Sequence, residues 1–302
     1  MSLLAISVSD LSKKYGERVA VSHANFEVPF GTICGFVGPN GSGKTTTMRM
    51  LLGLISPTGG RGLVLGQPLT APEKYLDRVG AMIEGPAFYP GLSGAENLRL
   101  LATLGGYPTD QVQGLLDRVG LGDRGDSKYK TYSLGMKQRL GIAASLLPNP
   151  QLLMLDEPTN GLDPAGIQEV RELLRNLADA GTTVFVSSHL LSEIEMISDS
   201  LVMLRKGEVI FAGRTQDLLL QQQPVILAKS ANPDDLPRLL QIAKESGHDG
   251  TIIDGVAHIL GPTEWAVNLN KMAFESGIIL AQLSPMLPTL EDTFFEMTGD
   301  SE

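Results

Sequence analysis

The sequence predicts an α/β fold built on a mostly parallel β-sheet, followed by a small α+β domain. Short, mainly apolar runs at 152–155 and 182–187 are typical of strands buried on both faces, and a helical pattern separates them. The β-rich run Thr32–Val37 leads through a glycine-rich loop into a helical pattern at 44–54. The composition changes at Gln221–Pro224, a polar segment that we expect to link the two domains.

The first domain is expected over residues 1–220, with two further parts beside its parallel sheet. Residues 3–8 and 19–28 alternate as strands do, and the glycine-rich residues 59–66 suit the turns of a small antiparallel sheet. Residues 92–147 read mainly as helices, with two glycine-containing breaks. They predict a helical subdomain over about 85–147.

The second domain, 221–302, shows six short elements in the order strand, helix, strand, strand, helix, strand. We expect them at 224–230, 233–246, 251–254, 256–261, 263–277 and 278–284. This is the element order of a ferredoxin-like unit. A last helix is expected at 288–298.

Composition and charge restrict the classes of function. The 302 residues are 42% hydrophobic and 19% charged, as in globular proteins, and the formal net charge is −10. So acidic a chain is a poor candidate for binding a nucleic-acid backbone. Apolar runs stay far below the roughly 18–20 residues that span a bilayer, and Met1–Val8 lacks the pattern of a signal peptide. The single cysteine, Cys34, excludes an internal disulfide framework, so we expect a soluble cytoplasmic protein with Cys34 in its core.

A phosphate-binding loop is predicted between the strand at 32–37 and the helix at 44–54. Residues 38–45 fit the pattern G-x-x-x-x-G-K-[ST] in the strand–loop–helix context that the motif requires. Glycines let the backbone wrap with its N–H groups inward, and the helix start adds a positive dipole end. Lys44 supplies a charge to the β- and γ-phosphates, and the Thr45 hydroxyl can bind Mg²⁺. The residues expected around the phosphates of ATP are Gly38, Pro39, Asn40, Gly41, Ser42, Gly43, Lys44, Thr45 and Thr46.

Two adjacent acids, Asp156 and Glu157, end the apolar run at 152–155. Successive strand side chains point to opposite sides, so neighbouring acids at a strand end can do different jobs. We expect Asp156 to hold Mg²⁺, and Glu157 to orient or deprotonate the attacking water. Alone, the pair is more typical of a solvated strand end, and it is the neighbouring phosphate loop that favours the catalytic interpretation.

With these motifs placed, residues 4–220 resemble the nucleotide-binding domain of the ATP-binding cassette (ABC) transporter superfamily. The segment Y-S-L-G-M at 132–136 is similar to the signature loop of that family, usually written L-S-G-G-Q. Ser133 and Gly135 are retained, whereas the third and fifth positions depart from the pattern. The resemblance implies that Ser133 and Gly135 contact ATP.

The resemblance assigns three further positions, two of which, Tyr15 and His189, would alone also fit a structural role. Tyr15, in K-K-Y-G, corresponds to the aromatic residue that stacks on adenine. Asp163, in G-L-D-P, corresponds to the D-loop residue that communicates across a dimer. His189, in S-S-H, corresponds to the switch histidine, whose ring N–H hydrogen-bonds the γ-phosphate and which we count as catalytic beside Glu157 and Lys44.

Glu84 marks a departure from the family. The segment Val79–Pro86 carries Glu84 where the family usually has a glutamine that touches Mg²⁺ and senses the membrane partner. A glutamate can also bind Mg²⁺, but it adds a negative charge near the triphosphate. Glu84, with the segments F-Y-P at 88–90 and E-N-L at 96–98, resembles the bacitracin-resistance and lantibiotic-immunity branch of exporters.

The end of the chain, Leu287–Gly299, resembles the tail of drug- and peptide-export ATPases. We expect an amphipathic helix with Leu290, Phe294 and Met297 on one side, packed on the second domain. Because the helix is acidic, insertion into a membrane is not expected.

The resemblance implies a head-to-tail homodimer with two ATP molecules at its interface, since a signature loop does not reach the phosphate loop of its own subunit. It further implies a cytoplasmic subunit that meets the inner face of the membrane only through a separate permease. That permease would contact the groove near Glu84–Glu96, with Phe88 and Tyr89 as candidates for its apolar floor. The function implied is ATP hydrolysis coupled to export of a peptide antibiotic or drug.

Three alternatives remain open from the sequence. An importer ATPase shares the motifs but not the exporter-like tail. A soluble ABC ATPase acting on ribosomes or DNA would usually carry two cassettes or long coiled coils. A small-molecule P-loop kinase would not need a signature loop. The second domain could regulate, dimerise or only pack.

Overall fold

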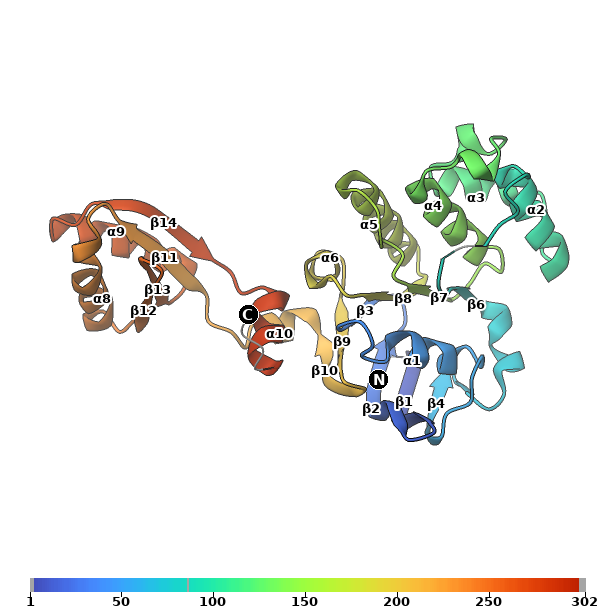
Figure 1. The fold of residues 1–302 in the computed structure, drawn as a ribbon, viewed down its shortest axis with the longest axis horizontal. Coiled ribbons are helices and arrows are strands. Elements are labelled where there is room, and N and C mark those ends of the chain that lie inside the picture. The colour runs from blue at the N-terminus through green and yellow to red at the C-terminus, as the bar shows by residue number, and fades with distance from the viewer. Residues whose placement is uncertain (1–2, 86, 299–302) are drawn as a thin grey trace. The chain divides into compact units, whose positions relative to one another are not determined.

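The structure is a computed structural model that describes residues 3–85 and 87–298, and it divides into two compact units, Met1–Thr215 and Gln216–Glu302 (Figure 1). Pro86 and Gly299, which end two of the segments discussed above, lie outside the described residues. The division falls inside a short helix, α7 (Thr215–Leu219), ahead of the polar segment Gln221–Pro224.

A six-stranded sheet organises the first unit, in the order β10-β9-β3-β8-β7-β6. Its strands are β3 (Ile33–Val37), β6 (Val79–Met82), β7 (Leu152–Asp156), β8 (Thr183–Ser188), β9 (Ser200–Arg205) and β10 (Glu208–Arg214). All neighbours are parallel except the edge pair β9 and β10. The carboxyl ends of β3, β8 and β7 therefore meet at one edge, where open α/β sheets bind their ligands.

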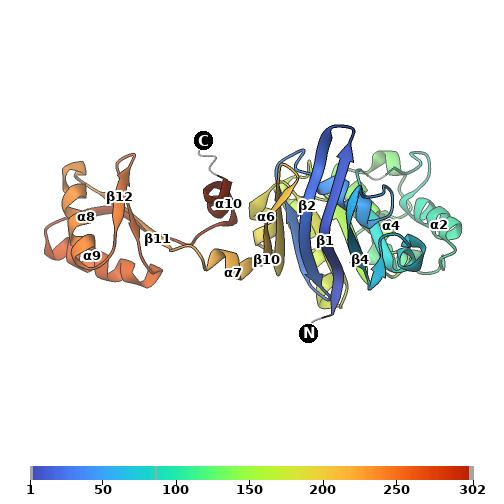
Figure 2. The ribbon, with the colours of Figure 1, turned by 90° about the horizontal axis from the view of Figure 1, so that it is seen from below.

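A second, antiparallel sheet has the order β2-β1-β4-β5 (Figure 2). Its strands are β1 (Leu4–Tyr15), β2 (Arg18–Pro29), β4 (Gly59–Val64) and β5 (Gln67–Pro68). The glycine-rich segment expected to form turns is mostly strand β4. The reason is a close approach, because a Cβ at Gly60 would lie 2.1 Å from the carbonyl oxygen of Asp10 on β1.

Helices cover the sheets and form a separate group beside them (Figure 1). They are α1 (Lys44–Leu51), α2 (Gly94–Gly105), α3 (Val112–Arg118), α4 (Leu134–Ser145), α5 (Pro164–Asp179), α6 (Leu191–Glu195) and α7. Helix α1 packs between the two sheets, whereas α5 and α6 cover the other face of the six-stranded sheet. Helices α2, α3 and α4 contact one another and form the helical subdomain. Short 3₁₀ turns in both units lie at Pro72–Lys74, Leu76–Arg78, Gly122–Arg124, Tyr129–Thr131, Pro233–Asp235 and Thr263–Trp265.

The main core fills the space between the two sheets. The rings of Phe26, Phe36 and Phe185 pack with centroid separations of 4.8–6.1 Å, and Met48 and Leu51 of α1 are fully buried beside them. Such aromatic contacts add about 0.5–1.5 kcal/mol each beyond the burial of their area. This core fixes α1, and with it the loop that precedes α1.

The second unit is an antiparallel sheet with two helices on one face. Its elements are β11 (Val225–Ser230), α8 (Leu236–Glu245), β12 (Gly250–Ile253), β13 (Val256–Leu260), α9 (Ala266–Glu275), β14 (Leu280–Met286) and α10 (Leu290–Thr298). The sheet order is β12-β13-β11-β14, and the two helices bury Leu239 and Leu269 against Ile226 and Ile259.

Helix α10 differs from the expectation at one position. Leu290 and Phe294 are buried as expected, but Met297 is 43% exposed. Among the described residues, no helix is both long enough and apolar enough to cross a membrane.

Cys34 offers a test of this core. It is fully buried in β3, and burial raises the pKa of its thiol to about 12. Because the thiolate is the reactive form, we expect native protein to resist a disulfide-exchange reagent at pH 8, where about one thiol in 10⁴ is ionised. Unfolding in guanidinium should release one reactive thiol per chain. Rapid labelling of the native protein would contradict the buried position of Cys34.

Candidate active site

The candidate site lies where three neighbouring strands of the six-stranded sheet end. Strand β3 leads into the loop at 38–43, β7 ends at Asp156, and β8 is followed by His189. Since β3 and β7 both pair with β8 in parallel, the three chain segments emerge side by side. The fold therefore brings residues about 30 and 110 positions apart into hydrogen-bond distance.

The loop before α1 depends on two glycines. A Cβ at Gly38 would lie 2.2 Å from the carbonyl oxygen of Leu204 in β9. Gly43 has φ +111°, and a Cβ there would lie 2.6 Å from the carbonyl oxygen of Ala20 in β2. Only glycine permits both approaches, so the loop is confined between the two sheets. Helix α1 begins directly after it, with the free N–H groups of its first turn at the loop.

Lys44 is the buried cation of the site. Its side chain is 6% exposed, and Nζ donates to the carbonyl oxygen of Gly38 at 2.6 Å. The same Nζ lies 3.3 Å from Oε1 of Glu157. A buried ammonium group is costly unless it is paired and hydrogen-bonded, and these contacts satisfy it. They also tie the loop after β3 to the end of β7.

Glu157 continues this chain of contacts to His189. Nδ1 of His189 lies 2.7 Å from Oε2 of Glu157, and because a carboxylate only accepts, the ring donates. The backbone N–H of Glu157 donates to Oγ of Ser187 at 2.9 Å, which holds the residue at φ +50°. A positive φ is uncommon outside glycine and costs free energy, so the fold imposes this orientation on the carboxylate.

Asp156 and Thr45 form a second pair beside the first. Oγ1 of Thr45 donates to Oδ2 of Asp156 at 2.7 Å, and Oγ of Ser187 donates to Oδ1 at 2.5 Å. The pair offers a hydroxyl and a carboxylate oxygen, the ligand types that Mg²⁺ prefers. Among the described residues no group of three or more His, Cys, Asp or Glu could hold a metal. With a hydroxyl and a carboxylate oxygen, the pair fits an ion that takes its remaining ligands from phosphates and water.

Ser42 carries a polar atom that fits a phosphate. Its Oγ is buried and has no hydrogen-bond partner within the described residues. A buried hydroxyl without a partner costs about 1–3 kcal/mol. Because Ser42 lies in the loop ahead of α1, a phosphate oxygen held by that loop would satisfy it.

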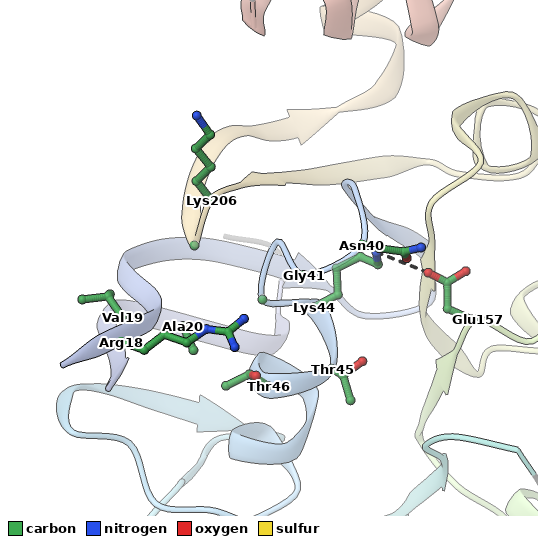
Figure 3. Close-up of a pocket in the computed structure, with 12 residues that line it drawn as sticks. Arg18, Val19, Ala20, Asn40, Gly41, Lys44, Thr45, Thr46, Glu157 and Lys206 are labelled. Atoms are coloured by element: carbon green, nitrogen blue, oxygen red, sulfur yellow. Dashed lines mark ion pairs between the residues drawn. The ribbon is translucent and has the colours of Figure 1, made fainter. Parts of the chain in front are cut away.

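A pocket of about 380 Å³ opens beside these residues (Figure 3). It is lined by Arg18, Val19, Ala20, Asn40, Gly41, Gly43, Lys44, Thr45, Thr46, Glu157, Lys206 and Gly207. The loop residues and Glu157 were foreseen from the sequence. The lining residues from β2 and from the β9–β10 turn were not predicted. The pair Lys206-Gly207, between two apolar runs, could have indicated the turn.

Two of the predicted site residues, Tyr15 and Glu84, are not among the residues that line the pocket. Tyr15 is 48% exposed at the end of β1, and its backbone pairs with Arg18. Nζ of Lys13 lies over its ring, 5.0 Å from the ring centroid. Glu84 is largely exposed, has φ +61°, and forms an ion pair with Arg49 of α1. Its assignment as a metal ligand stays a prediction.

The residues that the family resemblance assigns to the signature loop and the D-loop lie at the starts of two helices. Ser133 caps α4 by accepting from the N–H of Met136 at 3.2 Å, and Asp163 caps α5 by accepting from Gly166 at 3.0 Å. The two loops lie close together, since a Cβ added at Gly135 would lie 3.7 Å from a methyl group of Leu162. Ser133, Gly135 and Asp163 do not line the pocket at Lys44.

Around the predicted permease groove, polar residues brace the helical subdomain. Glu96 closes a capping box with Ser93, whose N–H and hydroxyl hold the pKa of the Glu96 carboxyl below its usual range. The buried Asn97 accepts from the N–H of Tyr89 at 2.8 Å and donates to its carbonyl oxygen at 3.1 Å. Phe88 packs edge-on against Tyr129, at 5.2 Å between ring centroids, whereas the Tyr89 side chain is 63% exposed.

Comparisons with known proteins give a consistent result. The family model described as "ABC transporter" matches residues 21–160. The chain is 38% identical to the bacitracin transport ATP-binding protein BcrA of Enterococcus faecalis, over 97% of this chain and 96% of that protein. It is 42% identical to the lantibiotic transport ATP-binding protein SrtF of Streptococcus pyogenes, over 68% of this chain and 89% of that protein. Among solved structures, cbiO1 from Clostridium perfringens, described as part of the transporter complex cbiONQ, matches with a TM-score of 0.66 at 26% identity, over 72% of this chain and 91% of that chain.

The exposed position of Tyr15 makes its expected stacking on adenine testable. If the ring stacks on the base, Tyr15→Ala should lower the affinity for ATP roughly 5- to 100-fold, which is the range expected for the loss of one base–aromatic stack. The affinity for inorganic triphosphate, which has no base, should stay unchanged. Titration calorimetry with both ligands separates the two outcomes. Equal losses for ATP and triphosphate would argue against stacking.

Proposed function

Because this chain belongs to the family of ABC transporter ATP-binding proteins and is the ATPase subunit of such a transporter, we propose that ATP hydrolysis at the candidate site drives export of a peptide antibiotic or a drug. The relationship to BcrA and SrtF supports export, since these relatives are described as serving bacitracin and lantibiotic transport. The first unit accordingly has the ABC ATPase fold, in which a mostly parallel sheet, an antiparallel sheet and a helical group combine.

One observation carries the catalytic part of the proposal: the continuous chain Lys44–Glu157–His189. Lys44 would exchange its contacts with loop carbonyls for the β- and γ-phosphates, which are stronger acceptors. Released from Lys44, Glu157 would use Oε1 to orient and deprotonate the attacking water, while Oε2 remains held by the ring of His189. In the imidazolium form of His189, in which both ring nitrogens carry a proton, Nδ1–H would stay on Glu157 and Nε2–H would donate to the γ-phosphate.

Thr45 and Asp156 would hold Mg²⁺, since they offer a hydroxyl and a carboxylate oxygen. When bound, it would neutralise the charge that develops on the transferred phosphoryl group. The protein's own part is orientation. Ser187 holds Asp156 through Oδ1 and the backbone of Glu157 through its N–H, so one hydroxyl fixes both acids.

We further propose that the working form is a head-to-tail dimer. Ser133 and Gly135 begin a helix outside the pocket at Lys44, which supports the idea that they serve the site of a second subunit. In such a dimer each ATP would lie between Lys44 of one chain and Ser133 of the other. ATP would close the interface, and loss of the γ-phosphate would remove the contacts that hold it closed.

A separate permease is the proposed membrane partner. Tyr89 presents an aromatic ring on the helical subdomain, and Asn97 and Phe88 fix the segment that carries it. Exposed aromatic residues on a braced scaffold are typical of docking sites. Through this contact the chain would sit at the cytoplasmic face of the membrane.

For the second unit we propose a ferredoxin-like arrangement and an accessory role, with the domain beginning near residue 221. Four antiparallel strands in the order β12-β13-β11-β14, with the helices α8 and α9 as crossovers, support this assignment.

Replacing Glu157 with glutamine tests the catalytic assignment. We expect Glu157→Gln to lower steady-state ATP turnover by roughly 10²–10⁴-fold, because the amide does not accept a proton from water. ATP binding should persist. Light scattering of this variant with ATP should then report the mass of two chains, since the closed state is no longer emptied by hydrolysis.

The matched control is Glu275→Gln, which neutralises an exposed glutamate of α9 and should keep the wild-type rate. Unchanged hydrolysis by Glu157→Gln would remove Glu157 from the mechanism. A variant that binds ATP but stays monomeric would contradict the dimer.

Affinity purification tests the transport role. Tagged Glu157→Gln protein, isolated from native membranes with ATP present, should recover a polytopic membrane protein at one-to-one stoichiometry. A parallel purification of Lys44→Ala serves as the control for nucleotide dependence. Recovery of ribosomal or DNA-bound proteins alone would favour a soluble ABC ATPase and overturn export.

A further inference from the structure

Two cations in the pocket have no part in the chemistry described so far. Arg18 and Lys206 both line it, and neither has an acidic partner among the residues the structure describes. The chain has 34 acidic and 24 basic residues, so unpaired cations facing one pocket are unexpected on charge alone. Lys44, the third cation of the pocket, is paired with Glu157.

The backbone under both residues is fixed against the phosphate loop. Arg18 begins β2, opposite Tyr15 in a tight hairpin. Lys206 and Gly207 form the turn between β9 and β10, with φ of +49° and +87°. The N–H of Gly207 donates to the carbonyl oxygen of Ser42 at 2.9 Å, and the N–H of Ser22 donates to that of Gly207 at 2.8 Å. The turn is therefore bound to the loop on one side and to β2 on the other.

The two cations lie at the end of the pocket remote from the hydrolytic residues. In Figure 3, Arg18, Val19, Ala20 and Lys206 lie on one side of Lys44, and Glu157 lies on the other. The guanidinium group of Arg18 points toward the start of α1 near Thr46. The ammonium group of Lys206 points outward, so it must change rotamer to reach a ligand, a motion that exposed lysines make in picoseconds to nanoseconds.

We propose that Arg18 and Lys206 bind the part of the nucleotide that does not react, at the α-phosphate. The inference rests on the proposed function, because it assumes that the γ-phosphate lies near Glu157. A nucleotide that runs from Glu157 along the loop places its α-phosphate toward β2, with Val19 and Ala20 beside the sugar. Contacts of this kind are the same for ATP and ADP, so they strengthen binding of both without distinguishing them.

The test compares Arg18→Gln, Lys206→Gln and the double variant by titration calorimetry with ATP and with ADP. Each single substitution should lower the affinity for ATP and for ADP about 3- to 10-fold. This range lies between the loss of a screened surface ion pair and the loss of a charged hydrogen bond. The double variant should weaken binding of both nucleotides more than either single variant does, and because the two cations would share one phosphate group the losses need not multiply. The dependence of Kd on ionic strength should become shallower, and the loss should appear in KM more than in kcat.

Two controls keep the outcome specific. Lys229→Gln removes an exposed cation of β11 and should bind both nucleotides as the wild type does. Arg18→Lys keeps the charge and should retain most of the affinity.

Unchanged Kd values in the double variant would overturn the inference, and so would a loss confined to ATP, which would place the cations at the γ-phosphate. Failure of the proposed function gives a different result. In that case the wild type would not bind ATP, or Lys44→Ala would bind it equally well.

Discussion

The buried ammonium group of Lys44 is the constraint on which the site depends. It is removed from water, so it must be paired, and its partners come from the loop after β3 and from the end of β7. That requirement explains why the sheet order matters more than any single motif. With β8 between β3 and β7, Ser187 reaches both acids and His189 reaches Glu157. A different strand order would leave the same residues apart.

Charge is distributed unevenly in this acidic chain. Both oxygens of Asp156 accept hydrogen bonds from hydroxyl groups, and both oxygens of Glu157 face cationic or N–H groups. The acids are therefore satisfied before any nucleotide arrives. Among the described residues, Arg18 and Lys206 have no acidic partner, and Ser42 carries a buried hydroxyl without a hydrogen-bond partner. The groups left over are donors and cations, which is the complement of a polyphosphate.

Site residues could be predicted from the sequence where a local motif defines them. They could not be predicted where the site forms from segments that are distant in the chain. The phosphate loop and the two acids could be predicted, because spacing and strand pattern define them. The pair Lys206-Gly207 indicates a turn, but the sequence does not bring that turn or Arg18 to the pocket, because this placement depends on β2 and the β9–β10 turn packing on the loop. The segment at 59–66 was expected to form turns but is mostly strand β4, because Gly60 packs against the backbone of Asp10, about 50 positions away. Helix α6 and strands β9 and β10 were also not predicted. Without the two strands, the six-stranded sheet would end at β3.

The ion pair between Glu84 and Arg49 has an evolutionary consequence. It joins the loop after β6 to the helix that starts at Lys44, and both side chains are partly exposed. A glutamine at position 84 would leave Arg49 without its carboxylate, and an uncharged residue at position 49 would leave Glu84 without its cation. The two positions should therefore be inherited as a unit. Lineages that carry glutamate at one are expected to keep a cation at the other, and lineages with glutamine are free to lose it.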